Sequence, residues 1–285
     1  MPVADVFRPD PPLIELRNVG KAFGAVEALR NVSVSLSRGD VVGLVGDNGA
    51  GKSTLIKLLA GTHDPTVGEV LLEGVQQTLS PPARAQRLGI ETVYQDLSLI
   101  GSFTAAENFF LGRELAWGGG PRVFRWMRRS AMLEAAVKGL DELRIEIPRV
   151  RTQPVDRMSG GQRQLTAIAR GAFWGSKLLL LDEPTAALGV RESREVLDLI
   201  SRLASRGITI LMVTHNLEHL WSVCNRVVVM RRGTKVADLA SRETTMDEVV
   251  AYITGAKGER DLARARSEEH VHDAGDAFPL AGREQ

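Results

Sequence analysis

Cysteine, surplus charge and long apolar runs are all scarce in this 285-residue chain. The single cysteine, Cys224, cannot form an intrachain disulfide, and the apolar residues before it predict a buried thiol in a reducing compartment. The longest apolar stretches, such as Ile208–Val213, fall far short of the roughly 20 residues that span a bilayer. The N-terminus shows no basic-then-apolar signal pattern. We therefore expect a soluble, cytoplasmic chain that would need partners for any work at a membrane.

Charge is balanced, with 36 Lys and Arg against 35 Asp and Glu. Nothing in that balance indicates a polyanion-binding surface, so no nucleic acid partner is expected. The length allows one large domain or two modest ones, and it suffices to bury a core without disulfides. No internal repeat is found.

The most informative segment is a glycine-rich loop that fits the pattern G-x-x-x-x-G-K-[ST]. Its members are Gly46, Asp47, Asn48, Gly49, Ala50, Gly51, Lys52, Ser53 and Thr54. An apolar run, Val41–Val45, precedes the loop, and a helical pattern, Leu55–Leu59, follows it. The N–H groups of the loop and the N-terminus of the following helix can bind phosphate oxygens. Lys52 would reach the terminal phosphates of the nucleotide, and Ser53 would supply an oxygen to Mg²⁺. The loop alone predicts a purine nucleotide, ATP or GTP.

Strand and helix patterns alternate around this loop, which predicts an α/β fold with a mainly parallel, helix-covered sheet. Alternating apolar positions between Leu13 and Leu36 indicate additional antiparallel strands. From about residue 97 to 156 strand signals stop and apolar residues recur at helical spacing, so we expect a mostly helical insertion. Residues 1–11 are expected to form a loose leader. Residues 256–285 are highly charged and predict a disordered tail, in which His270 and His272 are expected to be solvated.

Two acids follow a run of four leucines, Leu178–Leu181. Such a run suits a strand that is buried on both faces of a parallel sheet. Asp182, at the carboxyl end, could hold Mg²⁺ beside the phosphate loop, and Glu183 could orient or deprotonate the water that attacks the γ-phosphate. The structural alternative is a helix-capping turn before Pro184.

A second anion-binding nest lies far from the first, in the segment Met158, Ser159, Gly160, Gly161 and Gln162. Since one domain already has its phosphate loop, this second nest needs its own explanation. With it, the sequence resembles the ATP-binding cassette (ABC) family, whose signature is Leu-Ser-Gly-Gly-Gln; here methionine replaces the leucine. The resemblance covers about residues 12–255 and implies one cassette that binds ATP. It also implies that the nest contacts the nucleotide held by an opposite subunit.

Three further residues match the family's motifs in order. Gln95 matches the glutamine that contacts Mg²⁺ and the attacking water, and it joins the core to the insertion. His215 matches the histidine that contacts the γ-phosphate, although a lone histidine after a strand is usually structural. Phe23 matches the aromatic residue that stacks on adenine, although by itself it would be read as a core residue.

The closer resemblance is to ATPases of bacterial carbohydrate importers, especially a single-cassette type associated with fructose uptake. It is carried by residues 46–49, 89–95, 107–114, 175–177, 184–193, 245–246 and 254–257. Gly189, where most cassettes have aspartate, fits this group. The resemblance implies a homodimer on the cytoplasmic face of the membrane, with permease subunits and an extracytoplasmic sugar-binding protein.

Two questions stay open at the level of sequence. The basic stretch 122–129 could touch permease or lipid, or could be a solvated loop. The alternative function is a soluble ABC switch acting on nucleic acid, a ribosome or a regulatory partner. No extended heptad repeat of the DNA-repair type is present, and the sequence does not name the sugar.

Overall fold

The computed structural model describes residues 11–117, 126–147 and 149–258. Most of the expected leader and tail, including His270 and His272, lies outside the described residues. So does half of the basic stretch 122–129. No helix in the described ranges is long and apolar enough to cross a membrane.

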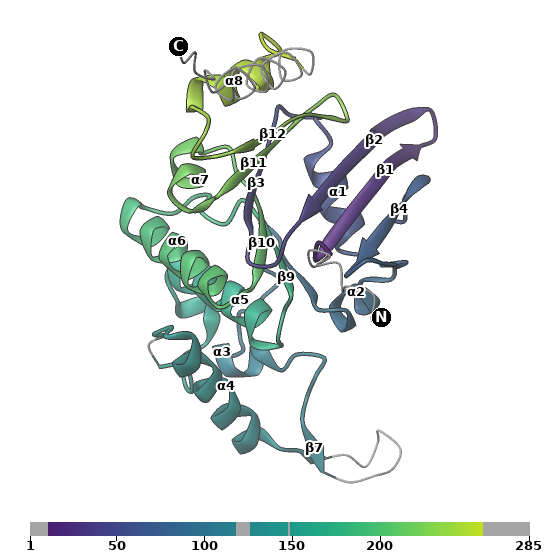
Figure 1. Ribbon diagram of the computed structural model, residues 1–285. Helices are drawn as coiled ribbons and strands as arrows, with labels where there is room; N and C mark the ends of the chain where they lie inside the picture. Colours follow the sequence, from purple (N-terminus) through teal and green to yellow (C-terminus); the bar gives the residue numbers. More distant parts are fainter. Residues whose placement is uncertain (1–10, 118–125, 148, 259–285) are drawn as a thin grey trace, which may run out of the picture.

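A six-stranded sheet forms the centre of the molecule (Figure 1). Its strand order is β12-β11-β3-β10-β9-β6, and all neighbours are parallel except β12, which pairs antiparallel with β11. The strands are β3 (Val41–Val45), β6 (Ile90–Val93), β9 (Leu178–Asp182), β10 (Thr209–Val213), β11 (Arg226–Arg231) and β12 (Thr234–Ala240). The expected mainly parallel α/β core is confirmed.

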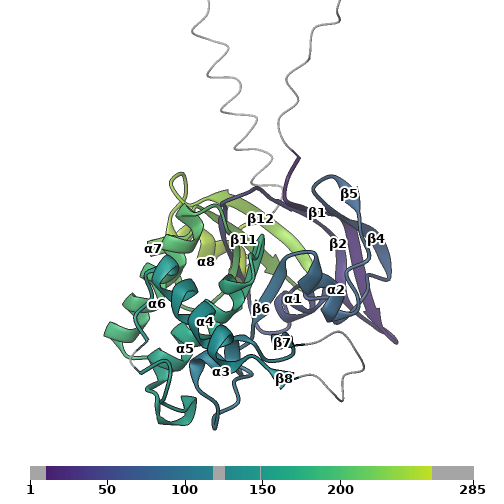
Figure 2. The same cartoon turned by 90° about the horizontal axis from the view of Figure 1, so that it is seen from below.

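A second sheet of four antiparallel strands lies beside the first, in the order β2-β1-β4-β5. Its strands are β1 (Ile14–Phe23), β2 (Val26–Leu36), β4 (Val67–Leu72) and β5 (Val75–Gln76). Figure 2 shows α1 (Lys52–Leu59) and α2 (Pro82–Arg87) on the side of the parallel sheet that faces this second sheet. The other side is covered by α5 (Gly160–Phe173) and α6 (Val190–Ser205), with α7 (Leu217–Val223) and α8 (Met246–Thr254) near β11 and β12.

The four leucines before Asp182 explain how one strand serves both sides of the sheet. Leu179 and Leu181 belong to the core under α5 and α6, whereas Leu178 and Leu180 belong to the core shared with α1 and the antiparallel sheet. All four are fully buried, as a central parallel strand requires. Cys224 is also buried and free, as expected, and burial raises the pKa of its thiol to about 12.

The insertion contains α3 (Ala105–Phe109), α4 (Arg129–Leu143) and a 3-10 turn (Val155–Arg157). The expectation that strands stop there is wrong in one place, because β7 (Ala116–Trp117) pairs antiparallel with β8 (Trp126–Met127). Each strand has two residues, which is too short for a period-two pattern to be recognised in sequence. The helical part of the prediction is confirmed.

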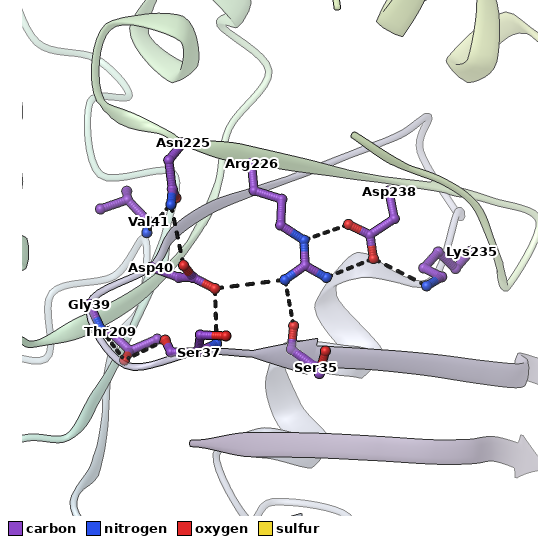
Figure 3. A network of polar contacts seen from close by, with 10 residues as sticks. All are labelled: Ser35, Ser37, Gly39, Asp40, Val41, Thr209, Asn225, Arg226, Lys235 and Asp238. Atoms are coloured by element: carbon purple, nitrogen blue, oxygen red, sulfur yellow. Dashed lines mark hydrogen bonds and ion pairs between the residues drawn. The ribbon is translucent and has the colours of Figure 1, made fainter. Parts of the chain in front are cut away.

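A polar network ties the two sheets together (Figure 3). Arg226, at the start of β11, donates from Nε and Nη2 to both carboxylate oxygens of Asp238, at 2.6 and 2.8 Å. Its Nη1 donates to the Ser35 carbonyl oxygen at 2.7 Å and lies 3.7 Å from an Asp40 carboxylate oxygen. One guanidinium thereby joins β2, β11, β12 and the turn before β3, which fixes the strand that leads to the phosphate loop.

Candidate functional site

The glycine-rich loop joins β3 to α1, as its sequence pattern predicts. The backbone of Gly46 has φ 147°, and a Cβ placed on it would lie 2.1 Å from the Met230 carbonyl oxygen of β11. Only glycine fits such a close approach between backbones. Gly51, at φ 102°, is packed in the same way against Ala28 and Leu29 of β2. The loop is therefore held from behind by neighbouring strands, and its front is left open.

Lys52 is buried at the first position of α1. Its Nζ donates to the carbonyl oxygens of Gly46 at 2.6 Å and Asp47 at 2.9 Å. Burial lowers the pKa of this ammonium, an effect opposed by the negative charge of Glu183. An ammonium held among loop carbonyls is placed to bind a terminal phosphate, whose charge would offset the cost of burial. Ser53 is exposed beside it.

The two acids lie where β9 ends, next to the end of β10. Val213 is the strand partner of Asp182, and the Glu183 N–H donates to the Val213 carbonyl oxygen at 2.9 Å. This pairing brings His215, two residues beyond the strand, to Glu183: its Nε2 lies 3.3 Å from Glu183 Oε1. Asp182, Glu183 and His215 therefore lie together at the edge of the sheet where β9 and β10 end.

Glu183 has an unusual backbone conformation and a partly buried carboxyl group. Its backbone has φ 52°, a region that L-residues rarely adopt. Burial raises the pKa of its carboxyl, although His215 acts in the opposite direction. The His215 ring lies at ion-pair distance from Oε1 without hydrogen-bond geometry, and buried Oε1 has no hydrogen-bond partner among the described residues, although the His215 backbone also acts to lower the pKa of the carboxyl. A buried acceptor without a donor suits a group that holds a substrate water.

Asp182 is also half-buried, and burial raises the pKa of its carboxyl while the charge of Lys52 lowers it. A carboxylate with the Ser53 hydroxyl provides the hard oxygen donors that Mg²⁺ prefers, and a cation would relieve the burial cost. The described residues contain no group of three His, Cys, Asp or Glu side chains that could bind a metal alone. A cation here would thus depend on hydroxyl, water and phosphate oxygens, which is compatible with Mg²⁺.

A cavity of about 400 Å³ opens over the loop. It is lined by Val45, Gly46, Asp47, Asn48, Thr214, His215, Leu217 and Ile253. Gln95 does not line it, but is exposed in a second cavity of about 380 Å³ beside Gly160.

Phe23, at the end of β1, is 44% exposed and meets the His63 ring edge-on, with ring centroids 5.2 Å apart. It is not a core residue, and an open aromatic face suits stacking on a base.

The second nest begins α5. Ser159 Oγ accepts from the Gln162 N–H at 3.2 Å, and Gln162 Oε1 accepts from the Ser159 N–H at 3.1 Å. This is a capping box, and its sequence signal is the S-x-x-Q spacing. Gly161 packs against Glu192 of α6, whereas the phosphate loop packs against β2 and β11. The two nests therefore have different neighbours within one chain.

Two residues to which the sequence assigned no role, Thr185 and Asn216, hold the His215 segment in place. Thr185 Oγ1 lies 3.0 Å from His219 Nδ1, which joins the turn after Glu183 to α7. Asn216 caps α7 by accepting from the His219 N–H at 3.0 Å. The Asn-x-x spacing before the helix could have predicted the cap, but no local signal marks the pairing across 34 residues.

Comparison with known proteins settles the family. The family model described as "ABC transporter" matches residues 29–186, a segment that contains the phosphate loop, the second nest and both acids. The chain belongs to the ABC transporter family. It is an ATPase of the ABC type, as the sequence resemblance implied.

Two relatives match this ABC cassette along nearly their whole length. The xylose/arabinose import ATP-binding protein XylG of Sulfolobus acidocaldarius is 42% identical over 89% of this chain and 99% of its own. The fructose import ATP-binding protein FrcA of Rhizobium meliloti is 42% identical over 86% of this chain and 95% of its own.

Solved structures agree with this assignment. The ADP conformation of the cassette MJ1267 superposes with TM-score 0.72 and 27% identity, covering 85% of this chain and 95% of its own. The dimeric cassette MJ0796 in a post-hydrolysis state with ADP and Pi has TM-score 0.66 and 26% identity, covering 81% and 100%. The ABC fold and its ATP chemistry are thus supported independently of the sugar-import relatives.

Proposed function

We propose that this ABC cassette hydrolyses ATP to drive import of a monosaccharide through a membrane permease. The observation that carries the proposal is the near-complete match to two relatives named for import of xylose or arabinose and of fructose. These are pentoses and a hexose, so the relatives support monosaccharides as a class without selecting one. None of the relatives reported above is named for work on nucleic acid or ribosomes, and the soluble-switch alternative is not favoured.

In this proposal Lys52 and the N–H groups of the loop bind the phosphates of ATP, with Phe23 on the adenine. Ser53, Asp182 and Gln95 would hold Mg²⁺, which supplies positive charge to the phosphate oxygens. Their oxygen chemistry and the half-buried state of Asp182 support that assignment.

Glu183 orients the attacking water and takes a proton from it, for which a buried carboxylate with a raised pKa is suited. His215 holds that carboxylate from one side and faces the loop cavity from the other. The phosphate loop and both residues line one edge of the sheet, so that water, carboxylate and γ-phosphate can meet.

A second copy of the chain would complete each site with its nest of Ser159, Gly160, Gly161 and Gln162. The nest and the loop pack against different elements of one chain, which supports this arrangement, as does the similarity to a dimeric cassette. ATP would then close the dimer and hydrolysis would reopen it. We place the pair on the cytoplasmic face of the membrane, where residues 97–114 transmit closure to permease subunits. An extracytoplasmic sugar-binding protein would choose the sugar.

The test is reconstitution of the chain in liposomes with its cognate permease and binding protein. We expect ATP hydrolysis to rise when the binding protein carries one monosaccharide of a panel of pentoses and hexoses, and that sugar to enter the liposomes. A rate of ATP hydrolysis that is unchanged by every sugar but rises with DNA or ribosomes would reverse the proposal.

A further inference from the structure

Three functional segments meet around the second cavity, which has a volume of about 380 Å³. They are the loop from Gln95 to Leu99 (the Gln95 loop), the start of α5 at Gly160, and residues 186–188 after the catalytic acids. Gln164, one turn into α5, forms part of the cavity wall. A side chain in this wall can contact both the Gln95 loop, which belongs to the chain's own ATP site, and the start of α5, which would serve the ATP held by the other copy.

Gln164 is only 7% exposed, and its Nε2 has no hydrogen-bond partner within the part of the chain that the structure describes. Burying an amide donor without an acceptor forfeits the hydrogen bonds that it makes to water. Met or Leu would fill a similar volume without this cost. A buried donor that is left unpaired in one state is therefore a candidate for a bond made in another.

The Gln95 loop already rests on α5 at its far end. Arg170 donates from Nη2 to the Leu97 carbonyl oxygen at 3.1 Å and from Nη1 to the Ser98 carbonyl oxygen at 2.8 Å. Ser98 has φ 50°, so the backbone turns sharply there. Gln95 and Asp96 at the near end are exposed and line the cavity. The loop is thus fixed to α5 at one end, while its other end faces the wall that contains Gln164.

We propose that Gln164 is a positioning residue whose amide donates to an oxygen of Gln95 or Asp96 when ATP closes the site. The bond fixes the near end of the Gln95 loop to the helix that begins with the Ser159 nest. Loading of ATP on the chain's own phosphate loop then sets the position of the nest that serves the other copy. This inference rests on the proposed ATPase cycle and adds to it a residue that contacts neither ATP nor Mg²⁺.

The experiment compares Gln164→Met with Gln153→Met as a matched control. Gln153 lies in the segment just before α5, and its Nε2 already donates to the Arg157 carbonyl oxygen at 2.8 Å. Melting temperatures are measured with and without ATP and Mg²⁺ in a Glu183→Gln background, in which we expect ATP to be bound with little turnover. ATPase rates are measured with Glu183 intact.

For Gln164→Met we expect a nucleotide-free melting temperature that is unchanged or higher by about 2 °C, because an unpaired donor is removed. The increase in melting temperature caused by ATP should shrink by about 3 °C, and kcat should fall about tenfold at an almost unchanged KM. Gln153→Met should show the reverse: a lower nucleotide-free melting temperature, an unchanged ATP increment and normal kcat.

An unchanged ATP increment in Gln164→Met, or a nucleotide-free melting temperature that drops as in the control, would overturn the inference. These temperatures require ATP binding but not sugar transport. A chain that fails to import any sugar would therefore refute the proposed function, while the role of Gln164 would still be decided.

Discussion

Replacing Glu183 by Gln should move turnover and stability in opposite directions. The change keeps the shape of the side chain but removes its charge and its ability to take a proton. General-base contributions are about 10²–10⁴-fold, so kcat should fall by that range. Binding of ATP should be retained, because Lys52 and the loop are untouched.

The stability effect follows from the environment of the carboxyl. Its side chain is 17% exposed, and burial raises its pKa above the ordinary value of 4.5. A carboxyl whose folded-state pKa is raised stabilises the fold at low pH, and this contribution is lost as pH rises through the folded-state pKa. At pH 7.5 the ionised, under-bonded group therefore costs about 1–2 kcal/mol, which the neutral amide would recover. For a chain of this size that is an increase in melting temperature of about 2–6 °C.

The assay is a coupled ATPase measurement beside thermal unfolding at pH 7.5 and below pH 4.5. Glu195→Gln is the control: this side chain is exposed on α6 and pairs weakly with Arg191 at 3.7 Å, so both quantities should stay near wild type. The gain in melting temperature should vanish at the acid pH, where both forms are neutral. A kcat within tenfold of wild type, or a lower melting temperature at pH 7.5, would refute the reasoning.

Three further predictions concern Asp238 in the polar network, Phe23 beside the site and Gly46 in the phosphate loop. Asp238→Asn should lower the free energy of unfolding, measured in urea at pH 7, by about 2–3 kcal/mol, because the half-buried Arg226 guanidinium loses its carboxylate partner on β12. Burial acts to raise the pKa of Asp238, but hydrogen bonds and charge from Arg226 lower it below its ordinary value of 3.8. The difference in unfolding free energy between wild type and Asp238→Asn should therefore shrink as pH falls below 3.8. A difference that stays constant with pH would contradict this. Phe23→Ala should weaken ATP binding about tenfold by calorimetry with little change in melting temperature, and unchanged affinity would exclude stacking on adenine. Gly46→Ala should destabilise the fold by about 3 kcal/mol or more, because its Cβ would lie 2.1 Å from the Met230 carbonyl oxygen. An unfolding midpoint equal to that of wild type would show that β11 moves to make room for the methyl group.

The parts predicted well from sequence are those whose signals are local. The loop needs only a strand before it and a helix after it, and both are found at Val41–Val45 and Lys52–Leu59. The leucine run before Asp182 predicts burial on both faces because side chains alternate along a strand. The S-x-x-Q spacing at Ser159 is a local signal of the same kind, since α5 begins directly after it, at Gly160.

The parts that sequence did not reveal depend on residues far apart in the chain. Arg226 and Ser35 are separated by 191 positions, and Arg170 and Ser98 by 72. No periodicity or motif records which carbonyl a distant guanidinium will meet. The same is true of Gln164: its burial is visible only when the Gln95 loop and the residues after Glu183 are placed around α5.

The capping box at the start of α5 supports the proposal that a second copy of the chain completes the nucleotide site. The first four N–H groups of a helix lack intrahelical partners. In this helix the side chain of Ser159 satisfies the N–H of Gln162, and Gln162 in turn secures Ser159. The N–H groups of Gly160 and Gly161 are left to bind an anion. Glu192 packs behind Gly161, while the phosphate loop packs against β2 and β11, which supports the proposal that this anion is bound by the loop of a second copy. In a dimer with two-fold symmetry the nest of each copy would meet the loop of the other, so both sites would form together or not at all.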